Sequence, residues 1–176
     1  MLELSSIARA ALVLDALTKQ AKVQVVRSEA TTPGKFLILF KGSEGEVEEA
    51  LGKGVAMAGA ALLDRLWLPD AHPEVLPLLA GLSRPLVADE SLLVHEYTHV
   101  ATALRALDRA LKSALVEAKK LHVARGIGGK AYFILGGTLD AVEAADEAAR
   151  GAGEADRLVA SETIARLSGD VTLEML

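Results

Sequence analysis

A histidine–glutamate–histidine motif is the feature of this sequence that comes nearest to a catalytic site. Residues 95–99 read His-Glu-Tyr-Thr-His. On a helix this H-E-x-x-H spacing places two imidazoles on one face, where they hold a zinc ion beside a glutamate that acts as general base. Glu117 is a candidate for a third ligand. The motif thus predicts zinc-dependent hydrolysis, on the condition that residues 95–99 are helical.

A glycine-rich segment suggests a second kind of chemistry. Residues 126–131 read Gly-Ile-Gly-Gly-Lys-Ala, a loose version of the fingerprint that holds a dinucleotide between a strand and a helix. The apolar residues 131–135 that follow are typical of a strand rather than a helix. The segment is therefore predicted to be a turn between two strands. His72 and His122 have no acid or nucleophile beside them in the sequence, so neither predicts catalysis.

The chain repeats itself, and the repeat bears directly on the histidine motif. Eight residues recur 93 positions later (96 minus 3): Glu3, Ala8, Ala10, Leu14, Asp15, Lys19, Ala21 and Val23 recur as Glu96, Ala101, Ala103, Leu107, Asp108, Lys112, Ala114 and Val116. After a loop two residues longer in the second copy, Gly34, Lys35, Gly42, Val47, Glu48 and Ala50 recur at an offset of 95 as Gly129, Lys130, Gly137, Val142, Glu143 and Ala145. Such repetition is the first thing to establish, because it determines the fold.

The first copy of the motif segment predicts a strand that runs into a helix. Residues 2–6 read Leu-Glu-Leu-Ser-Ser, an apolar strand followed by a serine N-cap. Thr98 is then expected to cap the second helix as Ser5 caps the first. In that register His95 and His99 lie on either side of a strand-to-helix junction, which disfavours a shared zinc ion.

Each copy is predicted to have the order β-α-β-β-α-β, the split βαβ arrangement. The first has strands at 2–4, 22–27, 35–40 and 62–68 and helices at 7–20 and 44–57, with a helical tail at 74–79. The second has strands at 92–97, 116–123, 130–135 and 157–164 and helices at 100–113 and 140–149. The fold class is therefore α/β (α+β), with two tandem ferredoxin-like domains at 1–82 and 91–176 joined by a linker at 83–90.

The composition excludes several classes of function. A net charge of −5 gives no basic face for nucleic acid. The chain has no cysteine, so disulfides and thiolate-held metal sites are excluded. The longest apolar run, Val55–Leu63, has nine residues, against about 20 for a membrane-spanning helix. A cytoplasmic protein with no membrane contact is expected.

The repeated residues resemble the shell proteins of bacterial microcompartments. The likeness begins with Leu-Glu-Leu-Ser-Ser-Ile-Ala-Arg at 2–9 and Asp-Ala-Leu-Thr-Lys at 15–19. It continues at residues 32–37, 62–64 and 72–77. Residues 124–132 are similar to the second half of the tandem-domain type. The resemblance covers nearly the whole chain and is greatest to the tandem iron–sulfur tile of propanediol-utilisation compartments.

This resemblance implies a structural protein with no enzymatic activity and no cofactor. Three chains would form a homotrimer with six domains, a pseudohexameric tile that packs against other shell proteins and passes small metabolites through a central pore. The implied pore-lining residues are Glu29, Ala30, Thr31, Thr32, Pro33, Gly34, Arg125, Gly126, Ile127 and Gly128. The implied contacts at the tile edge are Lys19, Lys112 and Arg166.

The chain departs from its family pattern at three places. The cysteine that holds an iron–sulfur cluster in the propanediol tile is Thr32 here, so a cysteine-held cluster is excluded. Residues 165–168 read Ala-Arg-Leu-Ser in place of a Pro-Arg-Pro-His-like edge motif, so only Arg166 carries over. His95 corresponds to no family role. Two alternatives stay open: a zinc hydrolase that uses His95, Glu96 and His99, and a small-molecule-binding regulatory domain.

Overall fold

The computed structural model describes residues 1–152 and 155–176. The chain forms two compact units, each described here by itself. The first contains residues 1–69 together with 124–129, and the second contains residues 70–123 and 130–176. The predicted domain bounds follow the repeat in the sequence and stay a prediction.

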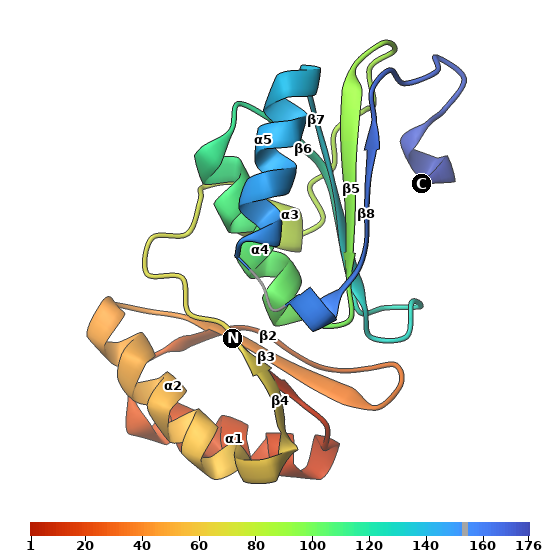
Figure 1. The fold of residues 1–176 in the computed structure, drawn as a ribbon. Helices are drawn as coiled ribbons and strands as arrows, with labels where there is room; N and C mark the ends of the chain where they lie inside the picture. The colour runs from red at the N-terminus through yellow and green to blue at the C-terminus, as the bar shows by residue number, and fades with distance from the viewer. Residues whose placement is uncertain (153–154) are drawn as a thin grey trace. The chain divides into compact units, whose positions relative to one another are not determined.

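The first unit is an antiparallel sheet covered by two helices (Figure 1). Its strand order is β2-β3-β1-β4. The elements are β1 (Leu2–Leu4), α1 (Ile7–Gln20), β2 (Gln24–Thr31), β3 (Lys35–Lys41), α2 (Glu44–Ala58), the 3-10 turn η1 (Gly59–Ala61) and β4 (Leu62–Arg65). The buried side chains of α1, which are Ala10, Val13 and Leu17, recur every three or four residues and pack against Leu2, Leu4 and Ile38 of the sheet.

The second unit repeats this arrangement with strand order β6-β7-β5-β8, and Figure 1 shows α4 and α5 on one face of its sheet. Its elements are α3 (Val75–Leu79), β5 (Ser91–Tyr97), α4 (Val100–Ser113), β6 (Glu117–Val123), β7 (Ala131–Gly137), α5 (Leu139–Arg150), η2 (Ala155–Arg157), β8 (Leu158–Ile164) and η3 (Leu173–Met175). Both strand orders match the ferredoxin-like βαββαβ topology, so the predicted fold class is confirmed.

The repeat extends to the irregularities of the sheets. The pairing of β2 with β3 shifts register between Val25 and Arg27, and the pairing of β6 with β7 shifts between Ala118 and Lys120. The residues inside these two bulges, Val26 and Lys119, are 93 positions apart. A bulge changes which way a strand's side chains point. Val26 is exposed, whereas Lys119 is buried.

Three local predictions were wrong by small margins. The N-cap of α4 is His99 rather than Thr98, whereas the N-cap of α1 is Ser6, one of the two candidate serines, and its hydroxyl accepts a hydrogen bond from the Arg9 amide. Strand β4 ends at Arg65 and not at residue 68, because its partner β1 has only three residues to pair with. Strand β2 extends to Thr31, where a tight turn returns the chain directly into β3.

Candidate functional site

The two predicted pore segments lie in the same compact unit. One is the end of β2 with the turn at 32–34, and the other is the turn between β6 and β7. Gly129 adopts a positive φ of 74° and approaches the first turn so closely that an added Cβ would lie 2.7 Å from the Thr32 carbonyl oxygen. Only glycine fits there. The segment 126–131 is thus a turn between strands, as predicted, and not a dinucleotide loop.

Two arginines share one carboxylate within this unit. Arg125 Nη2 lies 2.6 Å from Glu29 Oε2, and Arg27 Nε lies 2.6 Å from Glu29 Oε1. The Arg27 N–H does not point at that oxygen, so this second contact is an ion pair without a hydrogen bond. The hydrogen bond with Glu29 raises the pKa of Arg125. The cluster of Arg27, Glu29 and Arg125 therefore carries one net positive charge.

The other predicted pore residues differ in exposure. Thr31 is buried, and its hydroxyl has no hydrogen-bond partner among the described residues. Ile127 is half-buried. The exposed members are Ala30, Thr32, Pro33, Gly34, Arg125, Gly126 and Gly128. Thr32 replaces the cluster-holding cysteine, and the chain offers no thiolate elsewhere, so these residues do not fit an iron–sulfur cluster.

A lysine–glutamate ion pair occurs in both copies, next to each turn. Lys35 Nζ lies 2.8 Å from Glu3 Oε1, and Lys130 Nζ lies 2.8 Å from Glu96 Oε1. Lys35 also donates to the Gly129 carbonyl at 3.3 Å. All four side chains belong to the repeated positions, so the repeat itself was the signal that could have predicted both pairs. Of these four residues, the sequence analysis gave a role only to Glu96, as the general base of the zinc-hydrolase alternative.

The two predicted edge lysines have different surroundings. Lys19 is exposed and pairs with Asp15 at 2.7 Å. Lys112 pairs with the largely buried Asp108 at 2.8 Å and also donates to the carbonyl of Asp70. Both pairs join residues four apart on one helix, which is a weak interaction at an exposed site. The ammonium of Lys19 is therefore the one more accessible to a neighbouring molecule.

The third predicted edge residue, Arg166, is also exposed. Its Nε lies 2.5 Å from Asp89 Oδ1, and both side chains are more than half exposed. Such a pair costs little to separate in water. Arg166 is therefore able to exchange Asp89 for another carboxylate or carbonyl.

The zinc-hydrolase alternative is wrong for this geometry. His95 lies on strand β5, and His99 occupies the N-cap of α4 after that strand has ended. The two imidazoles therefore do not share a helical face. Among residues 1–152 and 155–176, no three His, Asp or Glu side chains gather closely enough to hold a metal ion. Glu117 instead pairs with Lys119.

His95 is the centre of a buried polar cluster. Its Nδ1 lies 2.8 Å from the Tyr97 hydroxyl, and its Nε2 lies 2.7 Å from Asp146 Oδ1 and 2.8 Å from the Ser161 hydroxyl. A proton on Nε2 satisfies these partners, with Tyr97 donating to Nδ1. Burial lowers the pKa of His95 despite the opposing effect of Asp146, so the ring is neutral. Burial also raises the pKa of Tyr97, which keeps the phenol protonated.

This cluster has the residue types of a hydrolase triad but not its geometry. In a triad the serine and the carboxylate contact opposite ring nitrogens, whereas Ser161 and Asp146 both contact Nε2. His95 also has no exposed surface that a substrate could reach. The cluster is therefore part of the core. The repeat carried the signal for it, since His95, Tyr97 and Asp146 stand where the first copy has Leu2, Leu4 and Leu51.

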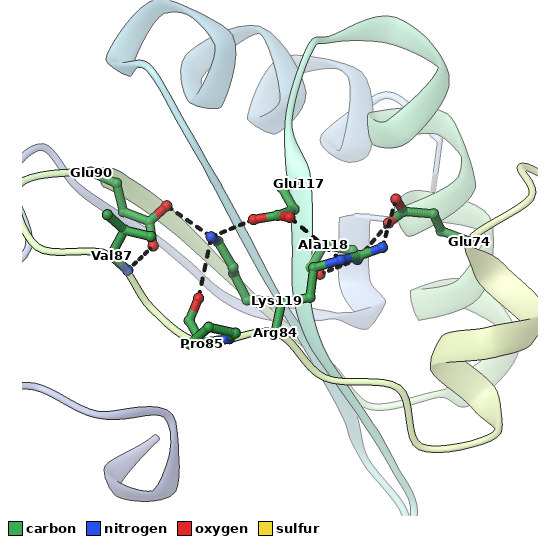
Figure 2. A network of polar contacts seen from close by, with 8 residues as sticks. All are labelled: Glu74, Arg84, Pro85, Val87, Glu90, Glu117, Ala118 and Lys119. Atoms are coloured by element: carbon green, nitrogen blue, oxygen red, sulfur yellow. Dashed lines mark hydrogen bonds and ion pairs between the residues drawn. The ribbon is translucent and has the colours of Figure 1, made fainter.

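A second polar network holds residues 84–90 on strand β6 (Figure 2). Lys119 is 2% exposed, and its ammonium lies 3.0 Å from Glu90 and 2.6 Å from Glu117. Burial alone would lower the pKa of Lys119, but its hydrogen bonds with these two carboxylates outweigh burial and raise it. Arg84 makes a two-pronged contact with Glu74 at 3.0 Å and donates to the Ala118 carbonyl at 2.7 Å.

A single protein family accounts for both copies of the repeat. The BMC domain model matches the chain at residues 1–71 and again at 91–167. The chain belongs to the BMC-domain family. A curated relative, the bacterial microcompartment shell protein PduT of Citrobacter freundii, is 38% identical over 167 residues, which are 94% of this chain and 90% of that protein.

Solved BMC-domain structures agree with this assignment. A microcompartment protein from Desulfitobacterium hafniense DCB is 30% identical, with a TM-score of 0.79 over 94% of this chain and 92% of that one. The double-ringed trimeric shell protein MSM0271 of the RMM microcompartment is 20% identical, with a TM-score of 0.66 over 85% and 78% of the two chains. At that identity the second likeness concerns the fold alone.

Family membership gives the chain the structural role of a microcompartment shell protein, in a family that is structural rather than enzymatic. The likeness to a tandem-domain shell protein is confirmed. No helix in the described part of the chain has the length and apolar character needed to cross a lipid bilayer.

Proposed function

We propose that this BMC-domain protein is a non-enzymatic tile in which three chains close a ring of six domains around a pore for small metabolites. The duplication is the observation that carries the proposal: a hexagonal tile needs six domains, and each chain supplies two. Closed cyclic symmetry is the usual form of a soluble homo-oligomer. The tiles would join other shell proteins around an enzyme pathway in the cytoplasm.

The pore in this proposal is lined by the turns at 29–34 and 125–128. Thr32 supplies a hydroxyl, Glu29 a carboxylate and Arg125 a guanidinium. The hydroxyl of Thr31, which was also predicted to line the pore, is buried within its own chain and cannot face the channel. Pores select by diameter, hydrogen-bonding groups and local charge. Because the cluster of Arg27, Glu29 and Arg125 is positive by one charge, a ring of three chains would favour anionic metabolites.

Reversing the charge of Arg125 tests this selectivity. Arg125→Glu changes the cluster from one positive to one negative charge, so entry of a small anion should fall about tenfold because electrostatic focusing in a narrow channel is lost. The measurement is flux of an anionic and a neutral solute of equal size into reconstituted shells. Arg125→Gln is the intermediate control. Unchanged anion flux in Arg125→Glu would contradict an anion-selective pore.

Replacing Lys19 with alanine tests the tile edge. Lys19 is exposed and contributes little to the fold, so Lys19→Ala should reduce the formation of extended sheets and leave the trimer intact. Electron microscopy measures the sheets, and light scattering measures the mass of the trimer. Lys112→Ala should act in the same direction. Loss of the trimer itself in Lys19→Ala would contradict the edge assignment.

A further inference from the structure

The lysine–glutamate pair that recurs in the two copies is enclosed in one copy and open in the other. In the first copy, the side chains of Lys35 and Glu3 are 17% and 0% exposed. In the second copy, the side chains of Lys130 and Glu96 are 42% and 35% exposed. The ion-pair distance is 2.8 Å in both. The two equivalent ion pairs therefore differ in solvent exposure and not in length.

The glycine turn at 126–129 shields the pair of Lys35 and Glu3 from solvent. Gly129 lies against Lys35, and its carbonyl oxygen accepts a hydrogen bond from the Lys35 ammonium at 3.3 Å. A glycine is required at position 129, because an added Cβ would lie 2.7 Å from the Thr32 carbonyl oxygen and 3.1 Å from the Lys35 side chain. The contact is thus a close fit between a glycine turn and a lysine.

The corresponding glycine of the first copy has no such contact within the chain. Gly34 stands 95 positions before Gly129 and also has a positive φ, of 111°. An added Cβ at Gly34 would meet no atom within 4 Å. Among the described residues, Lys130 contacts Glu96 through its ammonium and has no carbonyl in the place that Gly129 fills for Lys35. Gly34 of the first copy and Lys130 of the second copy are therefore both open to a contact like the one between Gly129 and Lys35.

We infer that Gly34 of a second copy of this chain packs on Lys130 and that its carbonyl oxygen accepts a hydrogen bond from the Lys130 ammonium. The contact joins two different surfaces, so it is heterologous, and heterologous contacts between repeats continue from chain to chain until a ring closes. The partner is another copy because Gly34 occupies the repeat position of Gly129 and, like Gly129, has a positive φ and no side chain to obstruct a close approach. This inference rests on the proposed ring and names the residues that close it.

Removing the Lys130 ammonium tests the contact. Lys130→Met should raise the dissociation constant of the trimer about tenfold or more, because the methionine loses an ion pair and a hydrogen bond that association encloses. Lys130→Arg, which keeps the charge, should retain most of the affinity. Lys53→Met, which removes an exposed lysine of α2, is the matched control and should leave the trimer unchanged. Native mass spectrometry over a dilution series gives the dissociation constants.

A photo-crosslinker at Thr32 locates the contact directly. If Gly34 packs on Lys130 of another chain, the neighbour of Thr32 in that chain should be the segment 126–130. The turn at 126–129 also contacts the turn at 32–34 of its own chain, so only the bands of covalent dimers and trimers on a denaturing gel are digested. Crosslinked peptides from these bands that join Thr32 to residues 126–130 would support the inference. If the wild-type protein forms trimers, but Lys130→Met leaves their dissociation constant unchanged and the crosslinks map elsewhere, the inferred contact is wrong and the proposed trimeric tile is unaffected. If the wild-type protein forms no trimer, both fail.

Discussion

Replacing Lys119 with methionine is expected to lower the free energy of unfolding by about 3 kcal/mol, because it leaves the largely buried carboxylate of Glu90 without its cation. Methionine has a similar length, so the change removes charge rather than volume. The Pro85 carbonyl, 3.4 Å from the ammonium, also loses its donor. Residues 84–90 should detach from β6 first. Urea denaturation at constant pH measures the loss of stability.

Two further variants separate the role of the ammonium from general effects. Lys120→Met makes the same change one residue along, at a half-buried site, and should cost less than about 1 kcal/mol. Gly136→Ala should also destabilise, since its Cβ would lie 2.5 Å from the Lys119 side chain, whereas Gly137→Ala meets nothing closer than 3.4 Å. If Lys119→Met and Lys120→Met cost the same, the network in Figure 2 stabilises the fold no more than the half-buried Lys120 does.

The His95 cluster is expected to make stability depend on pH below about 6.5. Burial in the folded chain lowers the pKa of His95. As the pH falls through 6.5, His95 is therefore protonated in the unfolded chain and stays neutral in the folded chain. The free energy of unfolding should therefore decrease with a slope of up to about 1.4 kcal/mol per pH unit. Asp146 acts in the same direction at lower pH. Burial would raise the pKa of Asp146, but hydrogen bonds from Ser161, His95 and Arg150 outweigh burial and lower it.

The first copy supplies the matched variant for this prediction. His95→Leu, Tyr97→Leu and Asp146→Leu together install the side chains of Leu2, Leu4 and Leu51, and the slope between pH 6.5 and pH 5 should become smaller by the contribution of His95. The buried Met1 amino group, whose pKa burial lowers to about 5, keeps its own contribution to the slope. Asp146→Leu alone should cost about 1–3 kcal/mol at pH 7, because the carboxylate accepts from both the His95 N–H and the Ser161 hydroxyl. Without it, the His95 N–H can donate only to Ser161, and the Ser161 hydroxyl loses its acceptor. An equal slope in the triple variant and the wild-type protein would contradict the role assigned to His95.

The arrangement of each copy was predictable because local patterns and the repeat agree. The apolar spacing of 7–20 and 100–113 predicts helices, and the first copy correctly indicates a strand at 95–97 in place of a zinc-binding helix. Strand ends were less predictable, since they depend on the length of the partner strand. The end of β4 at Arg65 is an example, because β1 stops pairing there.

The polar contacts were harder to predict because each joins residues far apart in sequence. The surroundings of Lys119 depend on a bulge in β6 and on the path of residues 84–90, and neither has a local signal. The pair of Glu29 with Arg125 joins strand β2 to the turn between β6 and β7, which only the folded chain brings together. The His95 cluster, in contrast, was visible in the sequence as three polar or aromatic substitutions at core positions of the repeat.

The mass and outline of the purified protein test the central claim most directly. The account predicts particles of three times the 18.4 kDa chain mass, with six lobes in negative-stain electron micrographs and a tendency to form hexagonal sheets at high concentration. A single species of 18.4 kDa at every concentration, with no discs or sheets, would contradict a tile built from three tandem chains.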